Sequence, residues 1–308
     1  MLQMITGSNF FCNSKAKAVF KITGEDAFSF LQGQFSNDLR TPVGGATYGL
    51  WLNQKGKVVA DSVLLRIAEN EFLAFSNHSL ASVIQQRLQD YLVADEVNLS
   101  DETMAYDRLI ISGAGCGALI KDFVKNELRV GQFIQWGDLF VVPGGLLPFE
   151  NYTVIGPQKS LASWRDQWVA RGWVEGSELA WNRARIAAGV PAIPDDLGPT
   201  DLPQEGGLEV GVIAYNKGCY LGQEVMARLK NLGQVRRRLH VVRGRGAPPE
   251  RLAVLYQGGK KIGELRSIAH HQEGFVALAM LALINLNSRA GLGLTPTGPE
   301  TIWLGAHE

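Results

Sequence analysis

Apolar and polar positions recur with two different periods along this chain, one typical of helices and one of strands. Phe28, Leu31 and Phe35 fall at helical spacing and predict a helix over residues 26–35, and a second apolar stripe predicts another over residues 80–92. The same criteria predict helices over 161–171 and 177–188, a strand over 18–22, and hairpin strands over 47–52 and 57–67. Helices and hairpins mixed in this way indicate an α+β fold.

Beyond about residue 238 the pattern changes to short strands separated by glycine-containing turns. Five strands are predicted there, over residues 238–242, 252–256, 261–265, 275–281 and 300–304. Short, evenly spaced strands are typical of a small closed barrel. We therefore predict a core over residues 1–238, made of two α+β subdomains that are either consecutive or interleaved in sequence, and a C-terminal β-barrel over residues 239–308.

Composition indicates an ordinary globular protein and argues against nucleic acid and membranes as its general partners. Of 308 residues 46% are hydrophobic and 19% charged, and the 30 Lys and Arg residues balance the 30 Asp and Glu residues. This balance argues against general nucleic-acid binding. The longest apolar run, around residues 276–284, is far shorter than the ~20 residues a helix needs to cross a bilayer. We expect a cytoplasmic protein without a membrane partner.

The number and spacing of the cysteines and histidines argue against a disulfide framework, a cysteine-ligated iron–sulfur cluster and a metal site. The three cysteines, at positions 12, 116 and 219, are an odd number with no close pairs, which does not suit a disulfide framework and agrees with a reducing compartment. An iron–sulfur cluster held entirely by cysteine needs four thiolates. None of the five histidines falls at metal-ligand spacing. No metal site is predicted.

The segment from Lys217 to Glu224, with the sequence KGCYLGQE, contains the most informative cysteine. Cys219 is flanked by glycine and tyrosine, so the segment is predicted to form a turn that presents the thiol, before a helix that begins near Gln223. Lys217 and Arg228 would favour the thiolate form. The alternative from residue chemistry alone is a small buried hydrophobic residue, which is the common environment of a free cysteine.

Three acidic or amide side chains have two interpretations each. Asp61 stands in an otherwise apolar strand, where it either faces water or contacts a ligand. Asn37 and Asp38 follow the first helix, where they either bond the local backbone or contact a ligand. The glycines at 113–118 superficially match a dinucleotide fingerprint, but a hairpin follows instead of a βαβ unit, so no nucleotide site is predicted.

The KGCY-x-GQE segment resembles the signature of the YgfZ-like folate-binding proteins, the iron–sulfur assembly relatives of the glycine-cleavage T-protein (aminomethyltransferase). Other stretches keep the family's order and spacing: FLQGQFSNDL (30–39), KGKVVAD (55–61), RIAAGVP (185–191), PQEGGL (203–208) and GQVRRR (233–238). The resemblance implies a three-lobed ring with two α+β subdomains and a small barrel. It also implies that tetrahydrofolate, or a derivative, is bound.

The resemblance also assigns roles to particular residues. It places Asp61 beside the reactive nitrogens of the folate, Arg185 on the wall of the folate cavity, and Cys219 as the functional thiol. Further residues expected near the folate or the thiol are Asn37, Asp38, Lys217, Gln223, Glu224 and Arg228. The implied function is assistance in the assembly or repair of iron–sulfur clusters, with client or assembly proteins as partners.

The alternative function is a folate-dependent aminomethyl or one-carbon transferase, in which Asp61 orients the reactive nitrogen and Cys219 is structural. Two departures favour the iron–sulfur branch: Ala187 stands where the T-protein pattern usually has a glutamate, and aminomethyltransferases have no cysteine in the segment that matches KGCY. Seven basic residues and no acidic one lie between Arg228 and Arg245. They form a solvated face, an RNA contact, or a site for a polyglutamate tail or an acidic partner.

Overall fold

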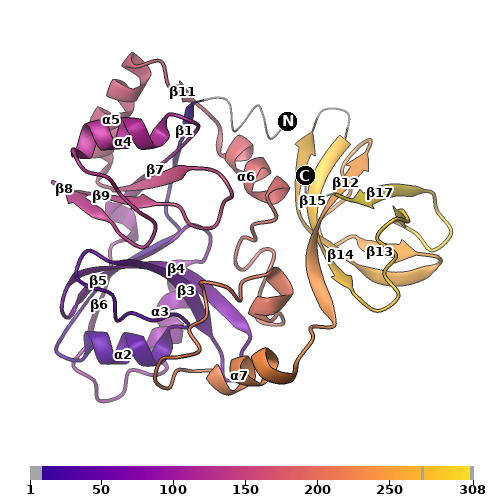
Figure 1. The fold of residues 1–308 in the computed structure, drawn as a ribbon, viewed down its shortest axis with the longest axis horizontal. Coiled ribbons are helices and arrows are strands. Elements are labelled where there is room, and N and C mark those ends of the chain that lie inside the picture. Colours follow the sequence, from indigo (N-terminus) through magenta and orange to yellow (C-terminus); the bar gives the residue numbers. More distant parts are fainter. Residues whose placement is uncertain (1–8, 272–273, 306–308) are drawn as a thin grey trace.

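The computed structural model describes residues 9–271 and 274–305. Its chain forms three lobes, two of mixed helices and strands and one barrel, with helix α6 (Glu178–Ala187) between the first lobes and the barrel (Figure 1). No helix among the described residues is long and apolar enough to cross a membrane. The predicted α+β fold with a C-terminal barrel is confirmed.

The first lobe is a five-stranded antiparallel sheet in the order β3-β4-β5-β2-β6. Its elements are β2 (Ala18–Thr23), α2 (Ala27–Gln34), β3 (Ala46–Leu52), β4 (Val58–Ala68), β5 (Glu71–Ser76), α3 (Ala81–Gln89) and β6 (Asn98–Asp101), followed by the 3₁₀ turn η1 (Thr103–Ala105). The stripe predicted from helical spacing is buried, because Leu31 and Phe35 pack with Trp51 in the core of this lobe.

The second lobe is a six-stranded sheet in the order β11-β1-β7-β10-β9-β8. Its elements are β1 (Phe10–Ser14), β7 (Asp107–Ser112), α4 (Cys116–Val124), β8 (Ile134–Trp136), β9 (Leu139–Pro143), β10 (Asn151–Gly156), α5 (Gln158–Ala170) and β11 (Val174–Glu175). Strand β7 is antiparallel to both of its neighbours, so the glycines at 113–118 lead into α4 outside any parallel βαβ unit. Cys116 is buried at the start of α4.

The two sheets pack against each other through one apolar layer. Val19, Leu65 and Phe75 of the first sheet meet Phe140 and Ile155 of the second, and all five are buried. The first two lobes are therefore joined by a shared core, as neighbouring layers of one body.

The barrel is closed and has six strands in the order β12-β15-β14-β13-β16-β17. These are β12 (Arg237–Arg245), β13 (Val254–Gln257), β14 (Lys260–His271), β15 (Gly274–Ala282), β16 (Leu292–Gly293) and β17 (Glu300–Leu304). Five of them correspond to the strands predicted from the sequence. The sixth, β16, is two residues long, which is too short to produce a periodic signal.

Helix α6 and the segment after it connect the lobes. Trp181 of α6 packs on Phe10 and Ile110 of the second lobe, and Ile186, one turn on, packs against Val276 of the barrel. A long connection containing η2 (Pro203–Gly206) then leads to α7 (Gln223–Leu232) and the barrel. One helix thus contacts both a sheet and the barrel.

Candidate functional site

A cleft of about 470 Å³ lies where α6, the turn after β5 and the barrel meet. The core contributes His78, Asn182 and Arg185 to its lining, and the barrel contributes Ser267 and His270. Because the core and the barrel both contribute residues to its wall, the shape of the cleft depends on how the barrel is held against the core.

Arg185 lies in the wall of the cleft and is held by hydrogen bonds from all three of its nitrogens. Its Nε donates to Asn182 over 2.7 Å, its Nη1 to Asp196 over 2.7 Å and to the Val190 carbonyl over 3.1 Å, and its Nη2 to Ser267 over 2.8 Å. These bonds engage four of the five N–H donors of the guanidinium. Arg185 is therefore fixed in place, with little freedom to reorient toward a ligand.

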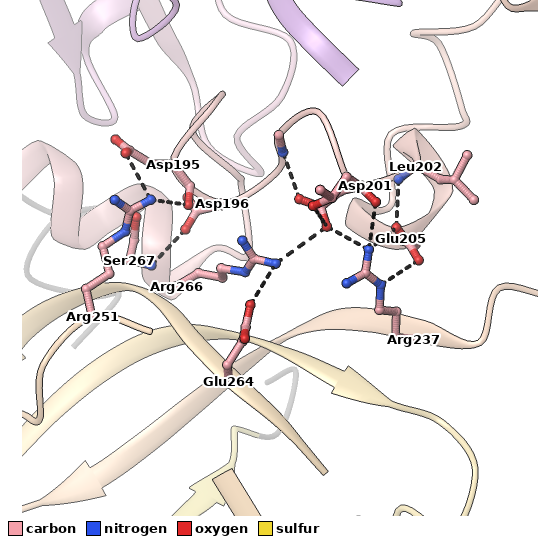
Figure 2. A network of polar contacts seen from close by, with 12 residues as sticks. Asp195, Asp196, Asp201, Leu202, Glu205, Arg237, Arg251, Glu264, Arg266 and Ser267 are labelled. Atoms are coloured by element: carbon pink, nitrogen blue, oxygen red, sulfur yellow. Dashed lines mark hydrogen bonds and ion pairs between the residues drawn. The ribbon is translucent and has the colours of Figure 1, made fainter. Parts of the chain in front are cut away.

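The connection after α6 is joined to the barrel by a network of polar contacts built around buried carboxylates (Figure 2). Arg237 of the barrel contacts Asp201 and Glu205, each over 2.8 Å, and Arg266 also reaches Asp201 over 3.5 Å. The side chain of Asp201 is wholly buried, so its charge depends on these partners. The network holds the barrel in the position that forms the cleft.

His78 lies on the core side of the cleft and has a strongly lowered pKa. Burial, and then the positive charges of Arg185, Arg108 and Lys17, lower its pKa to about 3. The imidazole is therefore neutral at pH 7 and offers one N–H donor and one acceptor. No sequence pattern pointed to this histidine, because its neighbours in space come from distant segments.

Asp61 is buried on β4, so the interpretation that it faces water is wrong. Its Oδ1 accepts hydrogen bonds from Ser79 over 2.6 Å and from Ser76 over 2.8 Å, and its Oδ2 accepts one from Tyr48 over 3.1 Å. Burial raises its pKa. Asp61 does not line the cleft but lies behind its wall, one hydrogen bond away from Ser79, the neighbour of His78.

Cys219 is exposed, whereas Cys12 and Cys116 are buried. The interpretation of Cys219 as a small buried hydrophobic residue is therefore wrong. Gly222, the second glycine of the segment, adopts φ +85° as the N-cap of α7, and a Cβ there would lie 2.8 Å from the Asn53 carbonyl oxygen. This close approach fits glycine alone, and it packs the cysteine segment against the turn between β3 and β4.

Lys217 is hydrogen-bonded to backbone carbonyls of the first lobe. Its Nζ donates to the carbonyl of Phe35 over 2.7 Å and to that of Asn37 over 2.8 Å, at the C-terminal end of α2. Burial lowers the pKa of Lys217 to about 8. The ammonium group therefore anchors the segment that carries Cys219 to the first lobe.

The predicted residues Asn37 and Asp38 make contacts within the protein. Asn37 donates to the carbonyls of Tyr48 and Gly211, both over 2.8 Å, and Asp38 pairs with Arg40 over 2.6 Å, which holds the pKa of Asp38 well below its usual value. Two further bonds are the local ones expected of the turn: the Asp38 amide donates to Asn37 Oδ1 over 2.9 Å, and the Arg40 amide donates to Asp38 Oδ1 over 3.0 Å. They surround the same end of α2 that Lys217 caps.

The remaining predicted residues lie at the start of α7. Gln223 accepts a hydrogen bond from the Tyr220 amide over 3.2 Å, while Glu224 and Arg228 are exposed on the helix. The structure thus divides the predicted residues into two groups. Arg185 lies at the cleft with Asp61 close behind, and the others gather around the cysteine segment.

The basic stretch from Arg228 to Arg245 is partly neutralised. Arg237 belongs to the network described above, and Arg238 pairs with Glu209 over 3.0 Å. Arg238 is exposed, which agrees with the solvated-face interpretation, whereas Arg237 is half-buried in the network. Among the described residues no group of three or more His, Cys, Asp or Glu side chains is arranged to hold a metal ion.

Comparison with known proteins finds two domain families to which parts of this chain are similar. The GCVT N-terminal domain matches residues 11–140, and the CAF17 C-terminal β-barrel domain matches residues 236–296. The chain thus combines a region similar to the GCVT N-terminal domain with a barrel similar to that of CAF17.

Particular relatives agree with this assignment. The human mitochondrial iron–sulfur cluster assembly factor IBA57 is 26% identical over 293 residues, covering 86% of this chain and 75% of the relative. An aminomethyltransferase of Bacillus cytotoxicus is 26% identical over 265 residues, covering 80% and 71%. The crystal structure of aminomethyltransferase T from Bartonella henselae, 20% identical, superposes with a TM-score of 0.80 over 94% of this chain and 83% of its own, which shows a common fold.

Proposed function

We propose that this protein binds tetrahydrofolate, or a derivative, and assists the assembly or repair of iron–sulfur clusters in client proteins. The observation that carries the proposal is the exposure of Cys219, alone among the three cysteines, on a segment anchored by Lys217. The name of the human relative, an iron–sulfur cluster assembly factor, supports the same function. An exposed thiol can exchange with a partner's sulfur or cluster ligand, whereas a buried one cannot.

The cleft is the proposed folate site. Its volume of about 470 Å³ falls within the range of small-molecule sites, roughly 300–1,000 Å³. Neutral His78, Asn182 and Ser267 offer donors and acceptors that suit the amide- and amine-rich edge of a pterin. Arg185 would contribute positive charge to the cleft wall from its fixed position. Asp61 would influence the ligand through its hydrogen bond with Ser79, behind the wall. Bound tetrahydrofolate would supply a nitrogen that carries one-carbon units.

Partners and compartment remain part of the proposal. We propose a client or assembly protein of the iron–sulfur pathway as the partner of Cys219, and the cytosol as the compartment, because reducing conditions would keep the exposed thiol free.

The test combines folate binding with client activity for wild type and Cys219→Ser. Calorimetry measures tetrahydrofolate affinity, and a cluster-dependent enzyme is assayed in cells that carry each form. We expect folate affinity to be unchanged while client activity is lost. Cys116→Ser, at a buried cysteine, is the matched control for the loss of a thiol elsewhere. Unchanged client activity in Cys219→Ser would contradict the proposed role of the thiol, and failure of wild type to bind any folate would contradict the proposed ligand.

A second candidate function is a folate-dependent aminomethyl or one-carbon transferase. The similarity to an aminomethyltransferase of Bacillus cytotoxicus favours it. In that case Asp61 would orient the reactive nitrogen and Cys219→Ser would retain activity. The discriminating measurement is formation of methylenetetrahydrofolate from an aminomethyl donor, with wild type and Asp61→Asn compared. Turnover that Asp61→Asn abolishes would favour the transferase.

A further inference from the structure

A second cleft, the aromatic cleft, lies on the second lobe between α4, α5 and the hairpin of β8 and β9, and has a volume of about 270 Å³. It shares no lining residue with the proposed folate site, and Figure 1 shows its elements on the side of the lobe away from the barrel. Its volume is just below the roughly 300 Å³ of the smallest typical ligand pockets, so a ligand there must be small. The proposed function does not use this cleft.

Packed aromatic rings form the inner part of the aromatic cleft. Trp164 of α5 is buried and lies against Phe123 of α4, with their ring centroids 4.8 Å apart. Arg171 follows Trp164 by two turns on the same face of α5, and its guanidinium lies over the Phe123 ring, 4.8 Å from the centroid. One face of Phe123 is therefore already covered by a cation of the protein itself.

Trp136, near the tip of the hairpin, forms the outer part of the aromatic cleft. It lies on the same face of β8 as Ile134, which packs against the core, yet the Trp136 residue is 45% exposed. The tip is held to α5, because Ser160 donates a hydrogen bond to Asp138 over 2.7 Å. A large aromatic ring that is exposed and held in one place offers a planar ligand a surface on which to stack.

The lining carries two cations and one carboxylate. Asp122 pairs with Lys125 over 2.9 Å and with Arg171 over 3.4 Å. The bond from Arg171 to the Gln167 carbonyl is also 3.4 Å long, and both bonds of Arg171 exceed the usual range of about 2.7–3.2 Å. Because the Arg171 side chain is 43% exposed and weakly engaged, most of its five N–H donors are available to an anion.

We propose that the aromatic cleft binds a small aromatic acid, whose planar ring stacks on Trp136 and whose carboxylate accepts hydrogen bonds from Arg171. Organic cations are the other ligand class that aromatic linings recognise. The net positive charge of the lining, and the guanidinium already over Phe123, argue against a cation here. The lining contains no cysteine, histidine, serine or threonine, so we expect the ligand to be bound without chemical conversion.

The experiment uses three probes that share one ring and differ in charge: benzoate, neutral benzamide and the cation benzylammonium. Their affinities are measured at low salt by NMR titration of the tryptophan indole N–H signals, and Trp136→Ala identifies the signal of Trp136. We expect benzoate to bind about tenfold more tightly than benzamide, which is the scale of one hydrogen bond to a charged group. Benzylammonium should bind most weakly. Cyclohexanecarboxylate, which has the charge but no planar ring, should bind more weakly than benzoate.

Arg171→Gln tests the role of the charge. We expect this variant to lose the tenfold preference for benzoate and to keep its affinity for benzamide. Arg165→Gln is the matched control, because Arg165 lies on the same helix, pairs with Asp166 and does not line the aromatic cleft. It should keep the preference. Arg171 is exposed, so thermal denaturation should show a fold as stable as that of wild type.

Trp136→Ala tests the role of the ring. We expect it to weaken the binding of benzoate and benzamide alike by about tenfold, because both lose the stacking surface. Trp303→Ala, which removes an exposed tryptophan from the barrel, is the matched control and should bind both probes as wild type does.

Three outcomes would overturn the proposal: wild type binds none of the aromatic probes, benzylammonium binds at least as tightly as benzoate, or Arg171→Gln keeps the preference for benzoate. Tetrahydrofolate binding and client activity are measured separately in Arg171→Gln. Because the two clefts share no residue, both should be unchanged, and a protein that prefers benzoate but binds no folate would contradict the proposed function alone.

Discussion

The guanidinium of Arg185 and the carboxylate of Asp196 form an ion pair, 2.7 Å from Nη1 to Oδ2, and the Asp196 side chain is wholly buried. Asp196 also accepts hydrogen bonds from the amides of Ala192 and Ser267, each over 2.8 Å. One carboxylate thus joins α6, the connection that follows it and the barrel strand β14. The wall of the cleft is built as a single unit around this pair.

Removing the carboxylate of Asp196 should strongly destabilise the protein. Asp196→Ala leaves Arg185 charged and buried without its ionic partner, and we expect the free energy of unfolding to fall by about 3–5 kcal/mol. Urea denaturation measures the change. Asp195→Ala is the matched control, because the pair of Asp195 with Arg251 is exposed and should contribute no more than about 1 kcal/mol. Equal losses in the two variants would show that the buried pair has no special role.

Arg237 and Arg238 are adjacent in sequence but should differ sharply in their effect on stability. Arg237→Met removes the nearer of the two arginine partners of the wholly buried Asp201, so we expect a loss of about 3 kcal/mol in the free energy of unfolding. Arg238→Met breaks only the exposed pair with Glu209 and should cost less than about 1 kcal/mol. Denaturation curves for both variants measure the difference. A loss in Arg238→Met as large as that in Arg237→Met would mean that the network does not depend on burial.

Much of the fold follows from periodicity and from the resemblance. The helix predicted over residues 26–35 and the two hairpin strands after it correspond to α2, β3 and β4. These elements could be predicted because their apolar residues recur at regular spacing and polar turn residues mark their ends. The strands β1, β5, β6, β10 and β11 were missed. Nearly every residue in β5 and β10 is buried or half-buried, so neither strand shows the alternation that marks a half-exposed strand.

Some residues of the candidate site could be predicted from the sequence, and others could not. Cys219 and Lys217 lie in one short motif, so sequence alone located them, although the contacts of Lys217 with the end of α2 came from 180 residues away. His78 carries no local signal. Its lowered pKa arises from burial and from charges on distant strands and helices, which only the folded chain brings together.

Lys217 should act as an anchor for the cysteine segment. Lys217→Met removes both hydrogen bonds from its ammonium to the carbonyls of Phe35 and Asn37, and we expect a loss of about 2 kcal/mol in the free energy of unfolding. The Leu221 amide, which donates to the Gly33 carbonyl over 3.2 Å, should exchange its hydrogen faster. Denaturation and hydrogen exchange measure the two effects.

Lys230→Met is the control for this anchor. Lys230 is exposed on α7, with its Nζ 4.3 Å from the centre of the Tyr215 ring, and its loss should cost less than about 1 kcal/mol and leave the Leu221 amide unchanged. If Leu221 exchanges at the wild-type rate in Lys217→Met, the segment is held by other contacts and Lys217 is not its anchor.

His78 should make stability depend on pH in a defined direction. Its pKa is about 3 in the folded protein and near 6.5 in the unfolded chain. Between these values the unfolded state binds a proton that the folded state does not. Stability therefore rises with pH across this window: the contribution of His78 is fully present above pH ~6.5 and is lost as pH falls toward 3, with a slope of at most about 1.4 kcal/mol per pH unit.

The comparison of wild type with His78→Gln isolates this contribution from that of the other titrating groups, because glutamine keeps a neutral hydrogen-bonding side chain without a proton to gain. We expect the difference in free energy of unfolding between pH 7 and pH 4 to be smaller in the variant. NMR of the folded wild type should show no protonation of His78 between pH 5 and 8. A protonation midpoint near 6.5 in the folded protein would mean that His78 is hydrated and that the charges of Arg108 and Arg185 do not act on it.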